Sequence, residues 1–281
     1  MTRGPQVESF FHASSNTISY LIWDPATLRG AIVDPVLDFD APRAVAGTTS
    51  IDAILKRAGE LNVQLDWSLE THVHADHISA AQRVRQQTSA RTVIGAAVRD
   101  VQRHFGPLFG VEAACDGSEF DKLVVDGDRL QLGELEIEVL SVPGHTPADV
   151  AYLTGDSLFV GDTLFMPDYG TARCDFPGGS ARQLHQSIQR LLRLPPETRM
   201  FLCHDYKAPG RESFAWETTV SQQRSNVHLR DSNEEEFVLM REARDSSLSA
   251  PAMLLPALQV NMMAGRMPDM LKLPVTWKAA S

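Results

Sequence analysis

Three histidines and one aspartate occur within six residues, directly after the apolar run at residues 65–69. They are His72, His74, Asp76 and His77. Imidazole and carboxylate groups bind divalent transition metals, so the cluster indicates a metal centre where a strand opens into a loop. Two histidines two residues apart can also form a hydrogen-bonding pair on a polar face, but the adjoining Asp76 and His77 favour a metal site.

Three further polar residues end apolar segments in the same way. His145 follows a Pro-Gly pair, Asp162 follows Gly161, and His204 comes after the short apolar run at residues 200–202. Taken singly, each would more often have a structural role. Together with the cluster they give seven candidate ligands, and each stands where a predicted strand ends.

The elements that must position these loops alternate between strand and helix, which is typical of an α/β fold. Strands are predicted from β-branched and aromatic runs, and helices from apolar residues spaced three or four apart. The predicted strands are residues 18–23, 30–33, 65–69, 91–94, 150–153, 158–160 and 200–202, with more strands and turns at residues 122–142. The predicted helices are residues 51–61, 78–85 and 180–194, the first with a capping box from Thr49 to Asp52.

The composition changes towards the C-terminus. We expect a catalytic domain at residues 1–213 and an extension at residues 214–281 that packs on the domain or on a partner subunit. Within the extension, residues 231–236 are predicted to form a polar, acidic turn, and residues 253–270 are rich in methionine, which is usual for a core or an interface. A homodimer is therefore the expected assembly.

Composition and charge exclude several classes of protein. With 43% hydrophobic and 22% charged residues, the 281-residue chain is predicted to be globular rather than disordered. A net charge of -10 makes nucleic acid a poor partner. The three cysteines, Cys115, Cys174 and Cys203, have no CxxC spacing, and residues 1–20 show neither a secretory signal nor a membrane span. We expect a cytoplasmic protein.

The ligand motifs together resemble those of the metallo-β-lactamase superfamily. The resemblance covers roughly residues 18–206 and rests on HVHADH at residues 72–77, GHTP at 144–147, GDT at 161–163 and the late His204. It implies an αββα sandwich with metal at one edge of the two sheets. A resemblance of this kind indicates the fold more closely than the substrate.

Other motifs resemble a narrower family, the persulfide dioxygenases, also called sulfur dioxygenases. They are GTARCDFPGG at residues 170–179, HDY at 204–206 and LPALQVN at 255–261, the last resembling a bacterial branch of β-lactamase-like hydrolases. The resemblance implies one Fe(II) per chain, held by His72, His145 and Asp162. It also implies that glutathione persulfide is oxidised by O2 and water to sulfite and glutathione. Two histidines and one carboxylate leave three positions on Fe(II) open.

In this interpretation the other four ligands, His74, Asp76, His77 and His204, are outer-shell groups that orient ligands, bind water or move protons. Because all seven ligands of a dinuclear hydrolase are present, a glyoxalase II-like thioester hydrolase with two Zn or mixed divalent metals is the alternative. Against it stand the GTARCDFPGG segment and the lack of a recognisable C-terminal helical domain with basic glutathione-binding residues. A sulfur-sensing binding protein without turnover is a third hypothesis, which the intact ligand set disfavours.

Three further residues near these motifs have candidate roles. Arg173 is predicted either to bind a carboxylate of glutathione or to fix its own loop by pairing with Asp175. Tyr206 is predicted to donate a hydrogen bond near the substrate sulfur or to form part of the pocket wall. Cys174 is predicted to be a buried, inert thiol rather than a nucleophile.

Overall fold

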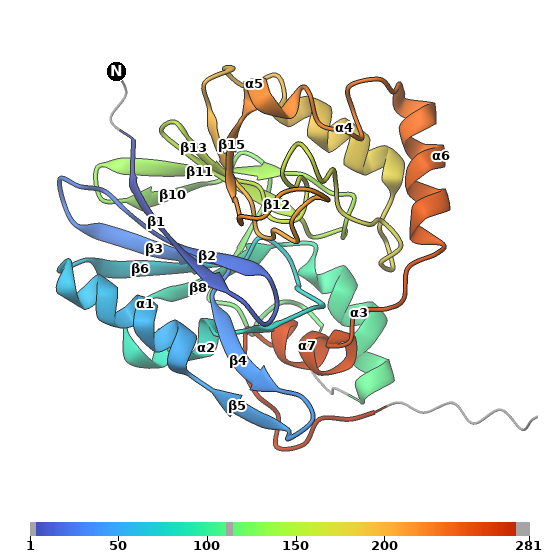
Figure 1. Ribbon diagram of the computed structural model, residues 1–281. Helices are drawn as coiled ribbons and strands as arrows, with labels where there is room; N and C mark the ends of the chain where they lie inside the picture. Colours follow the sequence, from blue (N-terminus) through green and yellow to red (C-terminus); the bar gives the residue numbers. More distant parts are fainter. Residues whose placement is uncertain (1–3, 111–114, 274–281) are drawn as a thin grey trace, which may run out of the picture.

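The computed structural model describes residues 4–110 and 115–273, and two six-stranded β-sheets pack face to face at its centre (Figure 1). The first sheet has the order β1 (Gln6–His12), β2 (Thr17–Trp23), β3 (Arg29–Val33), β6 (Gln64–Leu69), β8 (Arg91–Gly95) and β9 (Lys122–Val124). The second has the order β10 (Arg129–Leu132), β11 (Leu135–Ser141), β12 (Val150–Thr154), β13 (Ser157–Phe159), β14 (Arg199–Phe201) and β15 (Glu217–Thr219). A small third sheet contains β5 (Val45–Gly47), β4 (Val36–Asp40) and β7 (Ile78–Ser79).

Strand direction changes within the first sheet. β1, β2 and β3 pair antiparallel, whereas β6, β8 and β9 run parallel to β3. Parallel neighbours need crossover connections, and the helices α1 (Thr49–Glu60), α2 (Ala81–Gln87) and α3 (Val98–Phe109) supply them. Because β3 and β6 point the same way, the loops that follow them leave from the same edge of the sheet.

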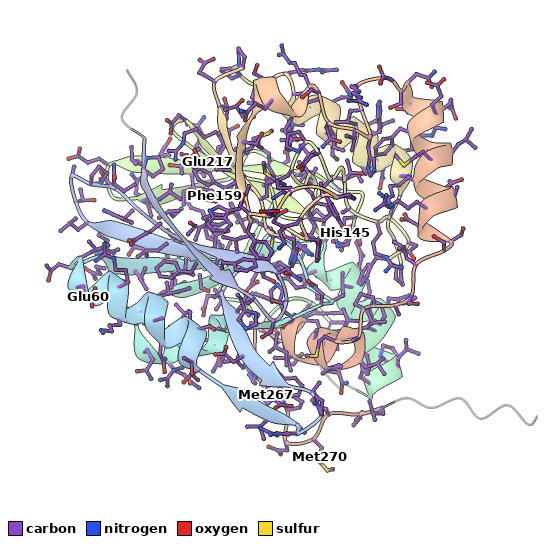
Figure 2. All side chains as sticks on the ribbon, viewed as in Figure 1. Glu60, His145, Phe159, Glu217, Met267 and Met270 are labelled. Atoms are coloured by element: carbon purple, nitrogen blue, oxygen red, sulfur yellow. The ribbon has the colours of Figure 1, made fainter. Side chains whose placement is uncertain are left out.

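Side chains alternate between the two faces of each strand, and this alternation builds the core. Tyr20 of β2 faces the second sheet, where its ring centroid lies 5.3 Å from that of Phe159 and 5.4 Å from that of Phe201. Its neighbour Leu21 faces the opposite way and packs against the outer helices. Figure 2 shows Phe159 in the middle of the molecule, between the sheets.

Helices cover the outer faces of both sheets (Figure 1). α1 and α2 pack on the first sheet through Ile51, Ile54 and Val84. α4 (Ala181–Leu191) packs on the second through Leu184 and Ile188, with α6 (Glu234–Asp245) against α4. The architecture is therefore the αββα sandwich that the resemblance to the metallo-β-lactamase superfamily implies. Within the described ranges, no helix combines the length and apolar character needed to cross a bilayer.

The described part of the chain after residue 213 packs on the rest of the same chain. It contains β15, α5 (Val220–Gln223), α6 and α7 (Leu254–Asn261). α7 lies against β7 and α3, and its Leu258 is buried beside Val73 of the ligand loop. Met262 is also buried, whereas Met270 is exposed at the periphery (Figure 2). The division at residue 213 stays a prediction, and residues 274–281 of the extension lie outside the described residues.

The predicted capping box of the first helix is wrong. Thr48, not Thr49, is the residue that precedes α1, and its side chain makes no capping hydrogen bond to the backbone. The Thr48 hydroxyl instead donates to Asp52 at 2.7 Å. The N–H of Ser50 is satisfied by Asp38, a strand residue that the local pattern of the helix does not include.

The predicted acidic turn at residues 231–236 is also wrong. Glu234, Glu235 and Glu236 form the first turn of α6, and Asn233 caps that helix through a capping box with Glu236. Acidic side chains are favourable in a first turn because the N-terminal end of a helix carries partial positive charge. The acidic run therefore begins a helix and does not form a turn.

Candidate metal centre

All seven candidate ligands lie on loops that follow strands of the two sheets. His72, His74, Asp76 and His77 follow β6, His145 lies between β11 and β12, Asp162 follows β13, and His204 follows β14. β13 and β14 are parallel neighbours, so the residues after them emerge side by side. The Oδ1 atom of Asp162 is consequently 3.5 Å from Nε2 of His204, although 42 residues separate them in sequence.

His72, His145 and Asp162 form one compact group. One side-chain atom of each lies within 4.8 Å of the others, and Oδ2 of Asp162 is 3.8 Å from Nε2 of His72 and 3.6 Å from Nε2 of His145. His72 Nε2 is buried and has no hydrogen-bond partner among the described residues. A buried ring nitrogen without a partner is costly unless a ligand occupies the position, so the group fits a bound cation.

The remaining ligands gather on the other side of Asp162. His204 Nε2 lies 3.3 Å from Oδ2 of Asp76, and His77 Nε2 is buried without a hydrogen-bond partner in the described chain. Ligand atoms of His74, His77, His204 and Cys203 also lie within 4.8 Å of one another. The residues therefore fit one cation or two, and Cys203 is a neighbour that the sequence reasoning missed.

Hydrogen bonds from the loops fix the orientation of the imidazole rings. His145 Nδ1 donates to the carbonyl oxygen of Arg173 at 2.7 Å, which leaves Nε2 free to face Asp162. His204 Nδ1 lies 3.2 Å from the carbonyl oxygen of Asn16, and His72 Nδ1 lies 3.0 Å from the Thr71 hydroxyl. Such contacts of the second ring nitrogen set the tautomer and the direction of a metal-binding histidine.

His74 is held by two buried carboxylates that the sequence reasoning missed. Its Nε2 atom lies 3.0 Å from Oδ1 of Asp34 and 3.5 Å from Oε2 of Glu70, and its Nδ1 atom has no partner among the described residues. Burial lowers the pKa of His74, but the two carboxylates outweigh it and raise that pKa well above its usual value. Asp34 directly follows β3, and Glu70 directly follows β6. The predicted ligands also follow strands, so this position could have identified both acids from the sequence.

Burial keeps two other imidazoles neutral. The pKa of His72 is held well below its usual value, first by burial and then by the neighbouring histidines. The same causes lower the pKa of His77 to about 3, although the charge of Asp76 acts in the opposite direction. Neutral imidazole is the form that binds metal, so these rings need no deprotonation at neutral pH.

A pocket opens onto the metal-binding group. Asp76, His145 and Asp162 form its floor, and the aromatic residues Phe165, Tyr169 and Tyr206 form one wall. The Tyr206 ring stacks on that of His204 with 5.5 Å between centroids and 11° between planes. A second part of the wall comes from residues 171–173 and from α6 and the turn after it, with Arg173, Arg241, Arg244 and Leu248 among its residues. A small molecule in this pocket would lie directly over His145 and Asp162.

The chain matches the metallo-β-lactamase superfamily over residues 16–204. It belongs to this superfamily. A probable metallo-hydrolase of Burkholderia pseudomallei is 47% identical, with 94% of each chain covered, and a glyoxylase B2 of Dictyostelium discoideum is 42% identical, with 95% of this chain and 94% of the relative covered. The β-lactamase hydrolase-like protein of Agrobacterium fabrum is 49% identical over 94% of this chain, which spans only 62% of the length of that relative.

Persulfide dioxygenases are among the similar proteins. The crystal structure of ETHE1 from Myxococcus xanthus is similar with a TM-score of 0.75 and 32% identity, covering 93% of this chain and all of that one. The human mitochondrial persulfide dioxygenase ETHE1 is 28% identical, with 92% of this chain and 88% of the relative covered. The names of the similar proteins thus include both hydrolases and a dioxygenase.

Arg173 makes the pairing with Asp175 that one of its two predicted roles requires. Its Nε and Nη2 atoms each donate to a different carboxylate oxygen of Asp175, both at 2.6 Å, and Nη1 donates to the carbonyl oxygen of Ser249. The guanidinium therefore fixes its own loop, and that loop in turn orients His145. Its donors are committed to this pairing, which leaves little capacity to bind a substrate carboxylate.

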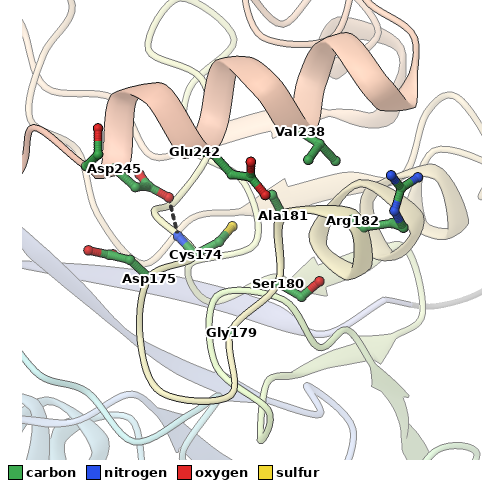
Figure 3. A pocket seen from close by; sticks show the side chains of 10 residues that line it. Cys174, Asp175, Gly179, Ser180, Ala181, Arg182, Val238, Glu242 and Asp245 are labelled. Carbon is green, nitrogen blue, oxygen red and sulfur yellow. Dashed lines mark hydrogen bonds between the residues drawn. The ribbon is translucent and has the colours of Figure 1, made fainter.

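Helix α6 anchors the same loop from the other side. Arg241 is fully buried and donates to Asp245 and to the carbonyl oxygen of Thr171. The Asp245 carboxylate also accepts from the N–H of Cys174 at 2.8 Å, as the dashed line in Figure 3 shows. These contacts connect residues 171–175 to the C-terminal part of the chain, and the sequence reasoning did not single out Arg241 or Asp245.

The groove drawn in Figure 3 is separate from the metal-binding group. It runs between α4 and α6, is lined by residues such as Arg182, Val238 and Glu242, and none of the seven candidate ligands lines it. Cys174 lies at its base, where burial and the nearby Asp245 raise the pKa of the thiol. A protonated, buried thiol agrees with the inert role predicted for Cys174.

Proposed function

We propose that the protein is a glutathione-dependent persulfide dioxygenase that holds one Fe(II) per chain through His72, His145 and Asp162. The proposal rests on the position of these three side chains, whose ligand atoms lie within 4.8 Å of one another, and on the open pocket that His145 and Asp162 line. Two histidines and one carboxylate with free positions are typical of Fe(II) oxygenases. The similarity to ETHE1 from Myxococcus xanthus and to the human persulfide dioxygenase ETHE1 supports the proposal.

The proposed reaction converts glutathione persulfide, O2 and water into glutathione, sulfite and two protons. The outer sulfur is oxidised from the formal state 0 to +4, and O2 accepts the four electrons. Water supplies the third oxygen of sulfite. Bound Fe(II) supplies the redox chemistry that allows O2 to react with a sulfur anion.

The residues of the chain position the reactants and handle protons. The aromatic wall of Phe165, Tyr169 and Tyr206 limits the access of water to the floor of the pocket. Partial burial, together with the charges of Asp76 and Asp162, raises the pKa of Tyr206, so its hydroxyl stays protonated and can donate a hydrogen bond to a persulfide sulfur. His204 and Asp76, paired beside the floor, are placed to accept protons released with sulfite.

A second candidate function is a dinuclear thioester hydrolase of the glyoxalase II kind. The cluster of His77, His204 and Asp76 beside Asp162 favours it, as do the relatives named metallo-hydrolase and glyoxylase B2. One sequence argument against it is wrong: the chain does have C-terminal helices, and α6 places Arg241 and Arg244 at the pocket. The two functions use the same fold and the same carrier thiol, so an assay must separate them.

The deciding experiment combines metal analysis with two assays on the same preparation. We expect about one iron per chain, oxygen uptake with glutathione persulfide, and one sulfite formed per O2 consumed. We expect no cleavage of S-lactoylglutathione. Two metals per chain with thioester cleavage and no oxygen uptake would establish the hydrolase instead.

We further propose a homodimer in a reducing compartment such as the cytoplasm. Cys174 and Cys203 are buried and form no disulfide, and the exposed Met267 and Met270 lie together at the periphery (Figure 2). Free, buried cysteines are usual where thiols stay reduced. Light scattering of the purified protein tests the assembly, because a monomer has half the expected mass.

A further inference from the structure

Three arginines line the pocket, and Arg244 is the one that forms no ion pair among the described residues. It lies in the last turn of α6, is exposed, and shares the pocket with His145 and Asp162. Arg173 pairs with Asp175, and Arg241 pairs with Asp245. Among the described residues, no carboxylate forms an ion pair with Arg244. Asp175 and Asp245 neutralise the charges of Arg173 and Arg241. The net charge of this part of the wall is therefore the single positive charge of Arg244.

The acids on the floor of the pocket do not cancel this charge. Asp162 faces His72, His145 and His204, and Asp76 faces His204, so both belong to the metal-binding cluster. The whole chain carries a net charge of -10, so the positive charge at this pocket is opposite in sign to the protein as a whole. A positive charge beside a reaction centre raises the local concentration of an anionic ligand.

We infer that Arg244 binds a carboxylate of the thiol that carries the persulfide, so that the substrate class is an acidic low-molecular-weight thiol. The inference deepens the proposed function and rests on it for the identity of the reacting group. An exposed guanidinium offers a planar pair of donors that matches a carboxylate, and it is free here because Arg173 and Arg241 hold the loop. Glutathione carries two carboxylates and fits this requirement.

A merely structural role of Arg244 must be separated from this one. A basic residue in the last turn of a helix is favourable for the helix itself, since that end carries partial negative charge. Arg193 offers a matched control. It is exposed, comes two residues after the end of α4, makes no ion pair within the described chain and does not line the pocket. R193Q therefore removes the same charge from a comparable helix end.

The test measures binding before activity. Calorimetry on the metal-loaded protein uses S-methylglutathione, which has both carboxylates but no free thiol to bind metal, and its diethyl ester, which has neither carboxylate. We expect R244Q to weaken binding of S-methylglutathione about tenfold or more, the size typical of a charged hydrogen-bonded pair. Binding of the ester is expected to be weak and equal in the wild type and R244Q. R193Q is expected to bind as the wild type does.

Kinetics with glutathione persulfide then place the residue in the reaction. We expect R244Q to raise KM about tenfold with kcat within about twofold, and R244K to recover part of the loss, because the contact is distant from the reacting sulfur. Equal affinity of the wild type and R244Q for S-methylglutathione would overturn the inference, as would no binding to the wild type at millimolar concentration. Oxygen uptake by the wild type tests the dioxygenase activity separately. If the wild type binds S-methylglutathione through Arg244 but consumes no oxygen with glutathione persulfide, the proposed reaction is rejected and the proposed substrate class is retained.

Discussion

The side-chain amide of Asn261, in α7, donates to the carbonyl oxygen of His77 at 2.7 Å. The same amide donates to the carbonyl oxygen of His74 at 2.8 Å, and its oxygen accepts from the N–H of Ser79. One buried side chain from the C-terminal part of the chain therefore satisfies three backbone groups of the ligand loop, which lies 184 residues earlier in sequence.

Replacement of Asn261 by alanine is expected to loosen that loop. Two carbonyls and one N–H would lose their partner in a buried place, so we expect the free energy of unfolding to fall by roughly 3 kcal/mol. Metal affinity should fall as well, because His74 and His77 lose their backbone anchor. Thermal unfolding and metal titration measure both effects. Gln183→Ala, at an exposed position of α4, is the control, and an Asn261→Ala variant that matches it would show that the amide does not hold the loop.

The fold and the ligand cluster could be predicted because their signals are local. A strand shows in a few consecutive residues, and the histidines follow strands at short, fixed spacing. Asn261 and Arg241 could not be predicted in this way, because they act on residues that are 184 and 70 positions away. The acidic turn was predicted wrongly for another reason: Asn233 and Glu236 are spaced as a capping box, and this signal was missed.

The count of metals can be tested by two single substitutions. Under the proposed function, His72→Ala removes a ligand of the one iron, and we expect no bound iron and no oxygen uptake. His77→Ala is expected to keep about one iron per chain, because His77 stays outside the ligand set. Elemental analysis of both variants measures this, with His185→Gln, on α4, as the control. A drop from two metals to one in His77→Ala would favour the dinuclear site.

Tyr206 is expected to act through its hydroxyl. Tyr206→Phe keeps the ring against His204 but removes the donor, so we expect kcat/KM for glutathione persulfide to fall about tenfold with iron content unchanged. Tyr206→Ala removes the wall as well and should cost more. Oxygen uptake at several persulfide concentrations separates kcat from KM. Wild-type kinetics in Tyr206→Phe would show that the hydroxyl does not contribute and that Tyr206 only forms part of the pocket wall.

His228 is expected to make stability depend on pH. Its Nδ1 atom accepts from the N–H of Thr171 at 3.0 Å, and burial, followed by the charges of Arg241 and Arg244, lowers its pKa to about 4. In the unfolded chain a histidine has a pKa of about 6.5. Between these two values the unfolded state binds a proton that the folded state does not. The contribution of His228 to stability is therefore complete above about pH 6.5 and declines as the pH falls towards 4.

His228→Asn isolates this contribution, because an amide oxygen can accept from Thr171 without titrating. Urea midpoints of both proteins, in the same metal-loaded state, are compared from about pH 8 down to about pH 5.8, which stays above the isoelectric point of 5.3. We expect the wild type to lose stability relative to the variant as the pH falls, since only the wild type carries this titration. The other buried histidines are common to both proteins and cancel in the difference. A difference that is constant with pH would mean that His228 is protonated equally in the folded and unfolded states, and that its contact with Thr171 does not exclude the proton.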